Sequence, residues 1–267
     1  MALACAGARA GAATPATPFI AAAAAPAATS AAAADPRAHW PTGPGSLAGV
    51  WANSDYDRGR VFDPRRQILR TIDGRMPPLQ PWAAELLEQR LKDGESGRVF
   101  VTPLSQCLPS GVPAMMFYPG LPIQILETPG QVTMLNEQLT NYRAIYLGAR
   151  HDEDPDPSFF GDSIGHWEGD TLVVDTIGLT TRTTLDQPGM PHSDRLHVIE
   201  RYRRTGQRRL ELKVTIDDPK VFTAPWTAIT HFAMTPDDRR IEEYICENNR
   251  NLESSGRIGV QAPASGR

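Results

Sequence analysis

Three kinds of motif are missing from this 267-residue sequence, and each absence argues against a class of site. None of the three cysteines belongs to a Cys-x-x-Cys pair, which argues against a structural zinc site. No Gly-x-Gly-x-x-Gly follows an expected strand, so a dinucleotide is not expected. No Gly-x-Ser-x-Gly turn presents a serine nucleophile. We therefore expect neither a cofactor nor a bound metal.

Charge of one sign and long apolar runs are also scarce. The formal net charge is −4 and the pI is near 5.9, so nothing points to nucleic acid as a partner. Pro15, Pro18 and Pro26 interrupt the most apolar region, which leaves no run near the ~20 residues that a membrane-spanning helix needs. The sequence does not indicate an oligomeric state.

The first 34 residues have a composition unlike that of a folded domain, with 19 alanines and one charged residue, Arg9. One interpretation is a secretory signal peptide with a small-residue cleavage site at 32–34, which predicts a periplasmic or secreted protein. The other is a disordered alanine-rich leader. We expect a linker over 35–46, one domain over 47–250 and a disordered polar tail over 251–267.

Strand patterns dominate the domain, and one stretch, residues 81–92, has the spacing of a short helix. Alternating or apolar runs bounded by turn residues predict strands over 47–51, 67–71, 121–126, 131–139, 142–147, 163–167, 171–176, 195–203, 208–216, 226–234 and 240–246. The runs after residue 130 read as four successive hairpins, the last formed by 226–234 and 240–246. Hairpins without βαβ alternation predict a mainly β protein, either an antiparallel β-barrel or a barrel-like sandwich. The proline-rich connection 52–120 is expected to cover one barrel mouth.

Several stretches carry a resemblance to known families. The Gly-Val-Trp of residues 49–51 resembles the Gly-x-Trp start of lipocalins. The string Trp-Glu-Gly-Asp-Thr-Leu-Val-Val-Asp-Thr at 167–176 resembles a large family of exported bacterial proteins of unassigned function. Further matches to that family lie at Leu47, 191–194, 198–202 and 246–248. The resemblance covers most of 47–250 and implies export and a compact, β-rich domain without implying an activity.

Two carboxylates fall within strands that we expect to be buried. Side chains alternate along a strand, so the apolar face of 196–202 also carries Glu200 and Tyr202. On an inward face, burial raises the pKa of Glu200 and suits it to acid–base catalysis; the alternative is an ion pair with an arginine at the barrel rim. Asp175 follows three apolar residues, and Arg143 is its expected partner, in a structural pair or in a contact with a polar group of a ligand.

Two histidines are candidates for a general base. His192 lies in a polar loop, where an imidazole titrates near neutral pH, and the neighbouring Asp194 is expected to cap that loop. His231 lies on the last expected hairpin together with Glu243, and the short alternation there does not decide which of the two points into a pocket.

Cys107 and Cys246 are the cysteines that remain once a leader is removed. In an oxidising compartment they would form a disulfide that closes a long loop and stabilises the fold by ~4 kcal/mol. The alternative is a pair of buried free thiols.

These patterns support two functions. The first is a cofactor-independent lyase, hydratase or isomerase that acts on a small apolar or aromatic compound. Its expected catalytic residues are His192 or His231 as the base, with Glu200 or Asp175 as the acid. Its expected substrate contacts are Arg143, Tyr202, Trp167 and Glu243. The second function is a non-catalytic carrier or periplasmic binding protein for a small apolar ligand, and the sequence leaves open whether the chain is an enzyme.

Overall fold

A computed structural model describes residues 46–55, 65, 67–98, 100–117, 121–236, 239–244 and 246. The predicted leader at 1–34, nearly all of the linker and the predicted tail at 251–267 lie outside the described residues. In the part of the chain that is described, no helix is both long and apolar enough to span a bilayer.

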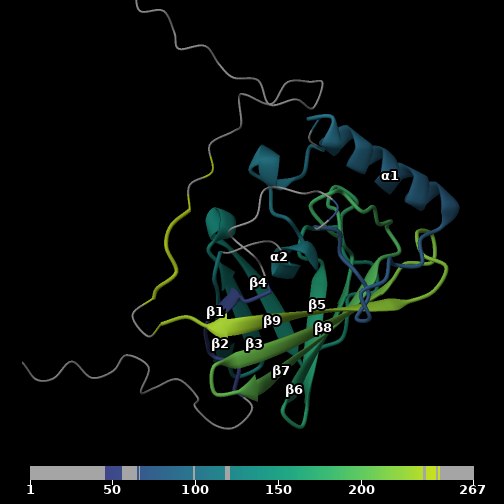
Figure 1. Ribbon diagram of the computed structural model, residues 1–267. Coiled ribbons are helices and arrows are strands. Elements are labelled where there is room, and N and C mark those ends of the chain that lie inside the picture. The colour runs from purple at the N-terminus through teal and green to yellow at the C-terminus, as the bar shows by residue number, and fades with distance from the viewer. Residues whose placement is uncertain are drawn as a thin grey trace, which may run out of the picture. The chain divides into compact units, whose positions relative to one another are not determined.

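Nine strands of the described chain form a closed barrel (Figure 1). They are β1 (Gly49–Asn53), β2 (Ile123–Thr128), β3 (Gln131–Asn136), β4 (Asn141–Leu147), β5 (Asp162–Glu168), β6 (Thr171–Ile177), β7 (His197–Gly206), β8 (Arg209–Asp217) and β9 (Trp226–Met234). Each strand pairs with the next, and β9 pairs with β1 to close the ring. The predicted mainly β fold with a barrel architecture is therefore confirmed.

One seam of the barrel differs from the others. β4 and β5 run parallel and pair only at Tyr146 with Ile164 and at Leu147 with Gly165, whereas the other neighbouring strands are antiparallel. Parallel neighbours need a connection that returns along the barrel. Residues 148–161 make that return, and Ser158 forms a bridge with Leu179 on the way. The hairpin predicted from 131 to 147 is present as β3 and β4.

Strand alternation sends every second side chain into the barrel. On β7, Val198, Glu200 and Tyr202 are buried, as the period of two predicts. The register places one inward-facing residue of each of five neighbouring strands side by side, in a row that we call the end row. It consists of Ser163, Thr176, Val198, Ile216 and Trp226. The end row marks the end of the barrel where β6 finishes and β7 begins.

The connection between β1 and β2 contains the helices. The predicted helix is confirmed as α1 (Pro81–Glu95), which starts at a proline and buries Leu87 and Leu91 while Trp82 stays 49% exposed. It is followed by the 3-10 turn η2 (Leu104–Gln106) and by α2 (Ala114–Phe117), whose Met115 and Met116 belong to the barrel core. A second 3-10 turn, η3 (Gln138–Thr140), precedes β4.

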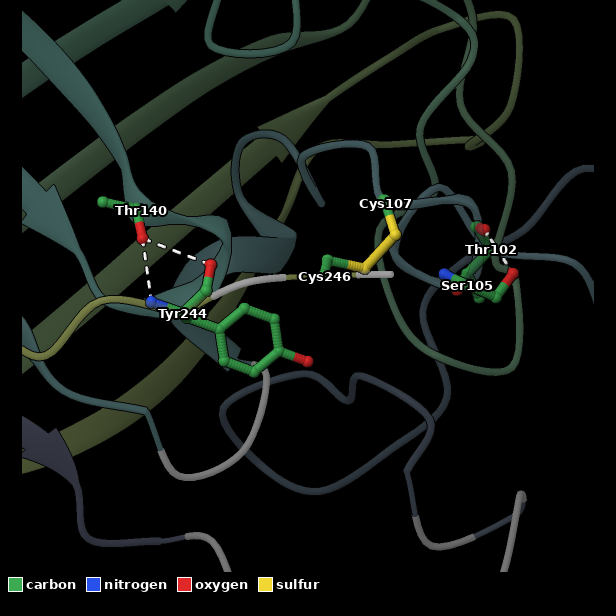
Figure 2. The surroundings of a disulfide bond; sticks show 6 residues. All are labelled: Thr102, Ser105, Cys107, Thr140, Tyr244 and Cys246. Atoms are coloured by element: carbon green, nitrogen blue, oxygen red, sulfur yellow. Dashed lines mark hydrogen bonds between the residues drawn. A yellow bond between two sulfur atoms is a disulfide. The ribbon is translucent and has the colours of Figure 1, made fainter. Parts of the chain in front are cut away.

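Two predicted strands are wrong. Residues 67–71 are irregular, and the backbone N–H of Leu69 donates to the carboxylate of Asp186 at 3.0 Å instead of to a neighbouring strand. The described part of 240–246 is also irregular, so the last predicted hairpin does not form. The edge of β9 that this segment was expected to pair with is taken by β1, because the sheet closes into a ring. The predicted disulfide is present between Cys107 and Cys246 (Figure 2).

Candidate ligand site inside the barrel

An ion pair lies inside the barrel. Arg143 points inward from β4 and Glu200 points inward from β7, and both side chains have 0% exposure. The guanidinium donates two hydrogen bonds to the carboxylate, with Nη1 at 3.0 Å from Oε1 and Nη2 at 2.5 Å from Oε2. This two-point contact matches the planar fork of a guanidinium to the two oxygens of a carboxylate.

Three hydroxyl groups complete the cluster. Ser163 Oγ accepts from Arg143 Nε at 3.2 Å, and Thr176 Oγ1 accepts from Nη2 at 2.8 Å. The Tyr202 hydroxyl donates to Glu200 Oε1 at 2.8 Å. We call Arg143, Ser163, Thr176, Glu200 and Tyr202 the interior polar cluster.

The electrostatics of the cluster follow from its burial. Burial alone would lower the pKa of Arg143, but the facing Glu200 carboxylate and Tyr202 raise it above its ordinary value. Burial, together with the Glu200 charge, raises the pKa of the Tyr202 hydroxyl well above its ordinary value. The phenol therefore remains a hydrogen-bond donor at neutral pH. Arg143 carries a full positive charge inside the barrel.

A buried donor in the end row has no acceptor in the described part of the chain. Trp226 is 5% exposed, and its indole Nε1 is buried without a hydrogen-bond partner among the described residues. Its ring packs edge-on against Phe222, with the centroids 5.4 Å apart. An unsatisfied buried donor costs about 1–3 kcal/mol, so its presence calls for an explanation.

The structure confirms the inward face of 196–202 and corrects the pairing of its carboxylate. Glu200 and Tyr202 are buried as expected, but the arginine partner of Glu200 lies deep in the interior and not at the rim. Arg143 was expected to pair with Asp175, and it pairs with Glu200 instead. Asp175 and Arg143 cannot meet because Asp175 occupies an outward position on β6, next to the inward Thr176.

Asp175 belongs to a charged group on the outer wall. Its Oδ1 lies 2.7 Å from His197 Nε2 and 3.0 Å from His151 Nε2. The other ring nitrogen of His151, Nδ1, lies 2.8 Å from Asp162 Oδ2. Burial would lower the pKa of His151, but its hydrogen bonds with Asp162 and Asp175 raise it above the ordinary value. The group clamps the return connection 148–161 against β5 and β6.

His192 lies buried in the loop between β6 and β7. Its Nε2 is 2.6 Å from Thr183 Oγ1, and its Nδ1 is 3.0 Å from the carbonyl oxygen of Ser193. Burial lowers the pKa of His192 below its ordinary value, so the ring is neutral. A neutral ring donates from Nδ1 to the Ser193 carbonyl, which can only accept, and its Nε2 faces the Thr183 hydroxyl, which also donates to the carbonyl oxygen of Thr180 at 3.0 Å. Asp194, expected to cap the loop, pairs with Lys220 at 2.6 Å on the surface.

The remaining predicted residues do not reach the interior polar cluster. His231 lies on the outward face of β9, where its Nδ1 contacts Asp55 at 2.9 Å. Trp167 is 37% exposed at the far end of β5. Glu243 is exposed on the irregular segment after β9. The four predicted catalytic residues therefore lie in separate places: Glu200 inside, Asp175 and His231 outside, and His192 in a loop.

Sequence reasoning missed Ser163, Thr176 and Trp226. Strand parity gives each of them an inward position, but their common row depends on the register of five strands, which a single sequence does not reveal. No group of three or more His, Cys, Asp or Glu side chains is arranged to hold a metal ion in the described residues.

Comparison with known proteins adds one structural similarity. No protein-family model and no curated protein sequence matches this chain. A crystal structure of a mutant of the fluorescent protein UnaG is similar over 43% of this chain and 71% of that chain, with 17% sequence identity and a TM-score of 0.26. A similarity of this size supports no statement about function, and the fold assignment depends on the strand pairing described above.

Proposed function

We propose that the chain binds a small, mainly apolar molecule at the end row of the barrel, with oxygens of the molecule held by Trp226 at one end of the row and by the interior polar cluster at the other. The observation that carries this proposal is the buried Arg143–Glu200 pair inside a mainly apolar interior. Apolar walls with a few convergent polar groups are typical of small-molecule sites.

Stability alone is a poor explanation for the ion pair. Removing two charges from water costs several kcal/mol per ion, and well-packed apolar residues in their place are often as stabilising or more so. A positive guanidinium held at a fixed position does, however, suit the recognition of a ligand oxygen.

Trp226 supports the same ligand chemistry from another position in the end row. Its unpaired N–H is a donor, so the matching ligand group is an acceptor such as a carboxylate or carbonyl oxygen. Val198 and Ile216 lie between Trp226 and Thr176 in the row and offer only apolar surface. Buried side chains fill the interior, so the chain segments that cover it must move to admit the ligand.

Binding is better supported than the predicted lyase, hydratase or isomerase reaction. Acid–base catalysis by Glu200 needs a base beside it. Among the described residues, no histidine forms a hydrogen bond with Glu200 or Tyr202, and His192 is already engaged with Thr183 and Ser193.

We also propose that the protein is exported. The Cys107–Cys246 disulfide supports this, because disulfides persist in oxidising compartments. Membership in the exported bacterial family remains a prediction from the sequence motifs. N-terminal sequencing of the protein from the periplasm of a bacterial host tests the proposal. A mature chain that starts near residue 35 supports it, and an intact N-terminus in the cytoplasm contradicts it.

The binding proposal is tested with a fluorescent carboxylate probe, 11-(dansylamino)undecanoic acid. We expect binding at one site and about 5- to 20-fold weaker binding by Trp226→Phe, the loss of one hydrogen bond. The variant should be at least as stable as the wild type, because it removes an unsatisfied donor. Trp82→Phe is the matched control, since the Trp82 indole donates to Lys220 on the surface. Absence of binding, or equal affinity in both variants, contradicts the proposal.

A further inference from the structure

The barrel wall is incomplete directly over the interior polar cluster. β4 and β5 pair only at residues 146–147 and 164–165, so the earlier part of each strand lacks a backbone partner across this seam. Arg143 lies in that part of β4, and Ser163 lies in that part of β5. Their side chains, 3.1 Å apart between Nη2 and Oγ, connect the two strands where the backbone ladder does not. The seam is therefore a part of the described barrel wall that adjoins the cluster without a backbone ladder.

Residues 110–117, which we call the cover segment, begin beside the starts of β4 and β5 that flank this seam and continue to β1. Ser110 Oγ donates to Gln138 Oε1 at 2.9 Å, just before β4 begins. Val112 N donates to the carbonyl oxygen of Phe159 at 3.1 Å, just before β5 begins. The helical part of this segment is α2 (Figure 1).

The cover segment is closed in this structure: residues 110–116 are buried, and three hydrogen bonds tie the segment to other parts of the described chain. Besides the two hydrogen bonds at its start, Asn53 Nδ2 donates to the carbonyl oxygen of Met116 at 3.0 Å. Gly111 has a φ of +79°, and a Cβ there would lie 2.6 Å from Thr183 Cγ2. Met115 and Met116 supply the apolar contact with the core, and unbranched thioether side chains repack readily.

A disulfide fixes the chain immediately before the cover segment. Cys107 precedes it by three residues, and Cys246 belongs to the C-terminal segment that runs beside η3. Arg239 holds Glu137 with two contacts of 2.9 Å, and Tyr244 N donates to Thr140 Oγ1 at 2.9 Å (Figure 2). The disulfide thus ties the base of the cover segment to the start of β4. Both cysteines are half-buried, so a small reductant has access to them.

We propose that the ligand enters between β4 and β5 beneath the cover segment, and that the Cys107–Cys246 disulfide latches this route. This latch rests on the proposed binding function, and it regulates how fast the ligand enters and leaves the same site. A dithiol reductant opens the latch: it gives two electrons and two protons, the S–S bond becomes two thiols, and the dithiol becomes a disulfide. Without the disulfide, the cover segment opens away from the seam more often, so the ligand binds and dissociates faster.

The rate of ligand release tests the latch. The dansylated fatty acid is loaded into oxidised protein, into protein reduced with dithiothreitol and into the double variant Cys107→Ser/Cys246→Ser, and it is displaced by excess oleate. We expect release at least about tenfold faster from the two latch-free forms. Affinity should change less than the rate, because opening speeds binding and release together. Equal release rates in all three forms overturn the latch. Failure of every form to bind the probe instead overturns the binding function itself.

A second variant covers the case in which the latch-free protein unfolds. Ser110→Ala removes the hydrogen bond to Gln138 while the disulfide stays intact. Ser105→Ala is its matched control, because the hydrogen bonds of Ser105 in the described part of the chain stay within its own turn, to Thr102 (Figure 2). Faster release from Ser110→Ala alone supports access beneath the cover segment. Equal release from both variants contradicts it. Hydrogen exchange should rise in 110–117 and not in β7 or β8.

Discussion

Arg143 on β4 and Glu200 on β7 face each other across the inside of the barrel and form an ion pair without solvent exposure. When one partner is removed, water cannot solvate the charge that remains, because neither side chain reaches solvent. Arg143→Met should therefore lower the free energy of unfolding by about 3–5 kcal/mol, because it leaves an uncompensated buried carboxylate.

Denaturant unfolding of three variants checks this prediction. Arg143→Met combined with Glu200→Leu should recover most of the lost stability, since no lone charge remains inside. Arg201→Gln is the control: Arg201 pairs with Glu168 on the exposed surface, where an ion pair contributes at most about 1 kcal/mol. If Arg143→Met costs no more than Arg201→Gln, the pair does not behave as a buried one.

The raised pKa of His151 predicts that the folded protein loses stability as the pH rises. Both of its ring nitrogens face carboxylates, Asp162 on one side and Asp175 on the other, and carboxylates only accept hydrogen bonds. Its pKa is raised in the folded protein, so its contribution is complete below the unfolded value of about 6.5 and disappears as the pH passes the folded pKa. The stability difference between wild type and His151→Gln should shrink between about pH 5.5 and pH 9. An equal difference at both pH values contradicts this, and His166→Gln, on an exposed ring, is the control.

His192 predicts the opposite dependence. Burial lowers its pKa, so its contribution to stability is present above about pH 6.5 and is lost as the pH falls. An NMR titration should place its midpoint below that of His151. Thr183→Val should cost about 1–3 kcal/mol, because it leaves the buried Nε2 without a partner. Thr171→Val, at a hydroxyl whose hydrogen bond to Asp170 is exposed to solvent, should cost less.

The tight packing around Gly161 predicts that one added methyl group lowers the stability of the protein strongly. Its φ is +64°, and a Cβ would lie 2.4 Å from the carbonyl oxygen of Ile177. Gly161→Ala should therefore cost about 3 kcal/mol or more. Gly130→Ala, at a similar φ of +80° but in open space, should cost about 1 kcal/mol and measures the backbone term alone. Equal melting temperatures of the two variants would show that β5 and β6 shift to accommodate the methyl group.

The sequence was sufficient to predict those features of the fold that local periodicity determines. The period of two in 196–202 gave the inward face of β7, and the spacing of 81–92 gave α1. Both features depend on neighbours along the chain.

The sequence was insufficient wherever the structure depends on distant partners. Glu200 meets Arg143 because the nine strands close into a ring, and no local pattern contains that curvature. Residues 67–71 and 240–246 have strand-like patterns, yet they find no strand partner in the described structure. The parallel seam between β4 and β5 was missed for the same reason, since alternation is the same in parallel and antiparallel strands.

The pairing of β1 with β9 sets the order in which a newly synthesised chain can finish folding. β1 ends at Asn53, whereas its partner β9 ends at Met234, so β1 leaves the ribosome long before that partner exists. Until then the nascent sheet has two open edges that can recruit other chains. A truncation before Trp226 should consequently aggregate or depend on chaperones, although it contains eight of the nine strands.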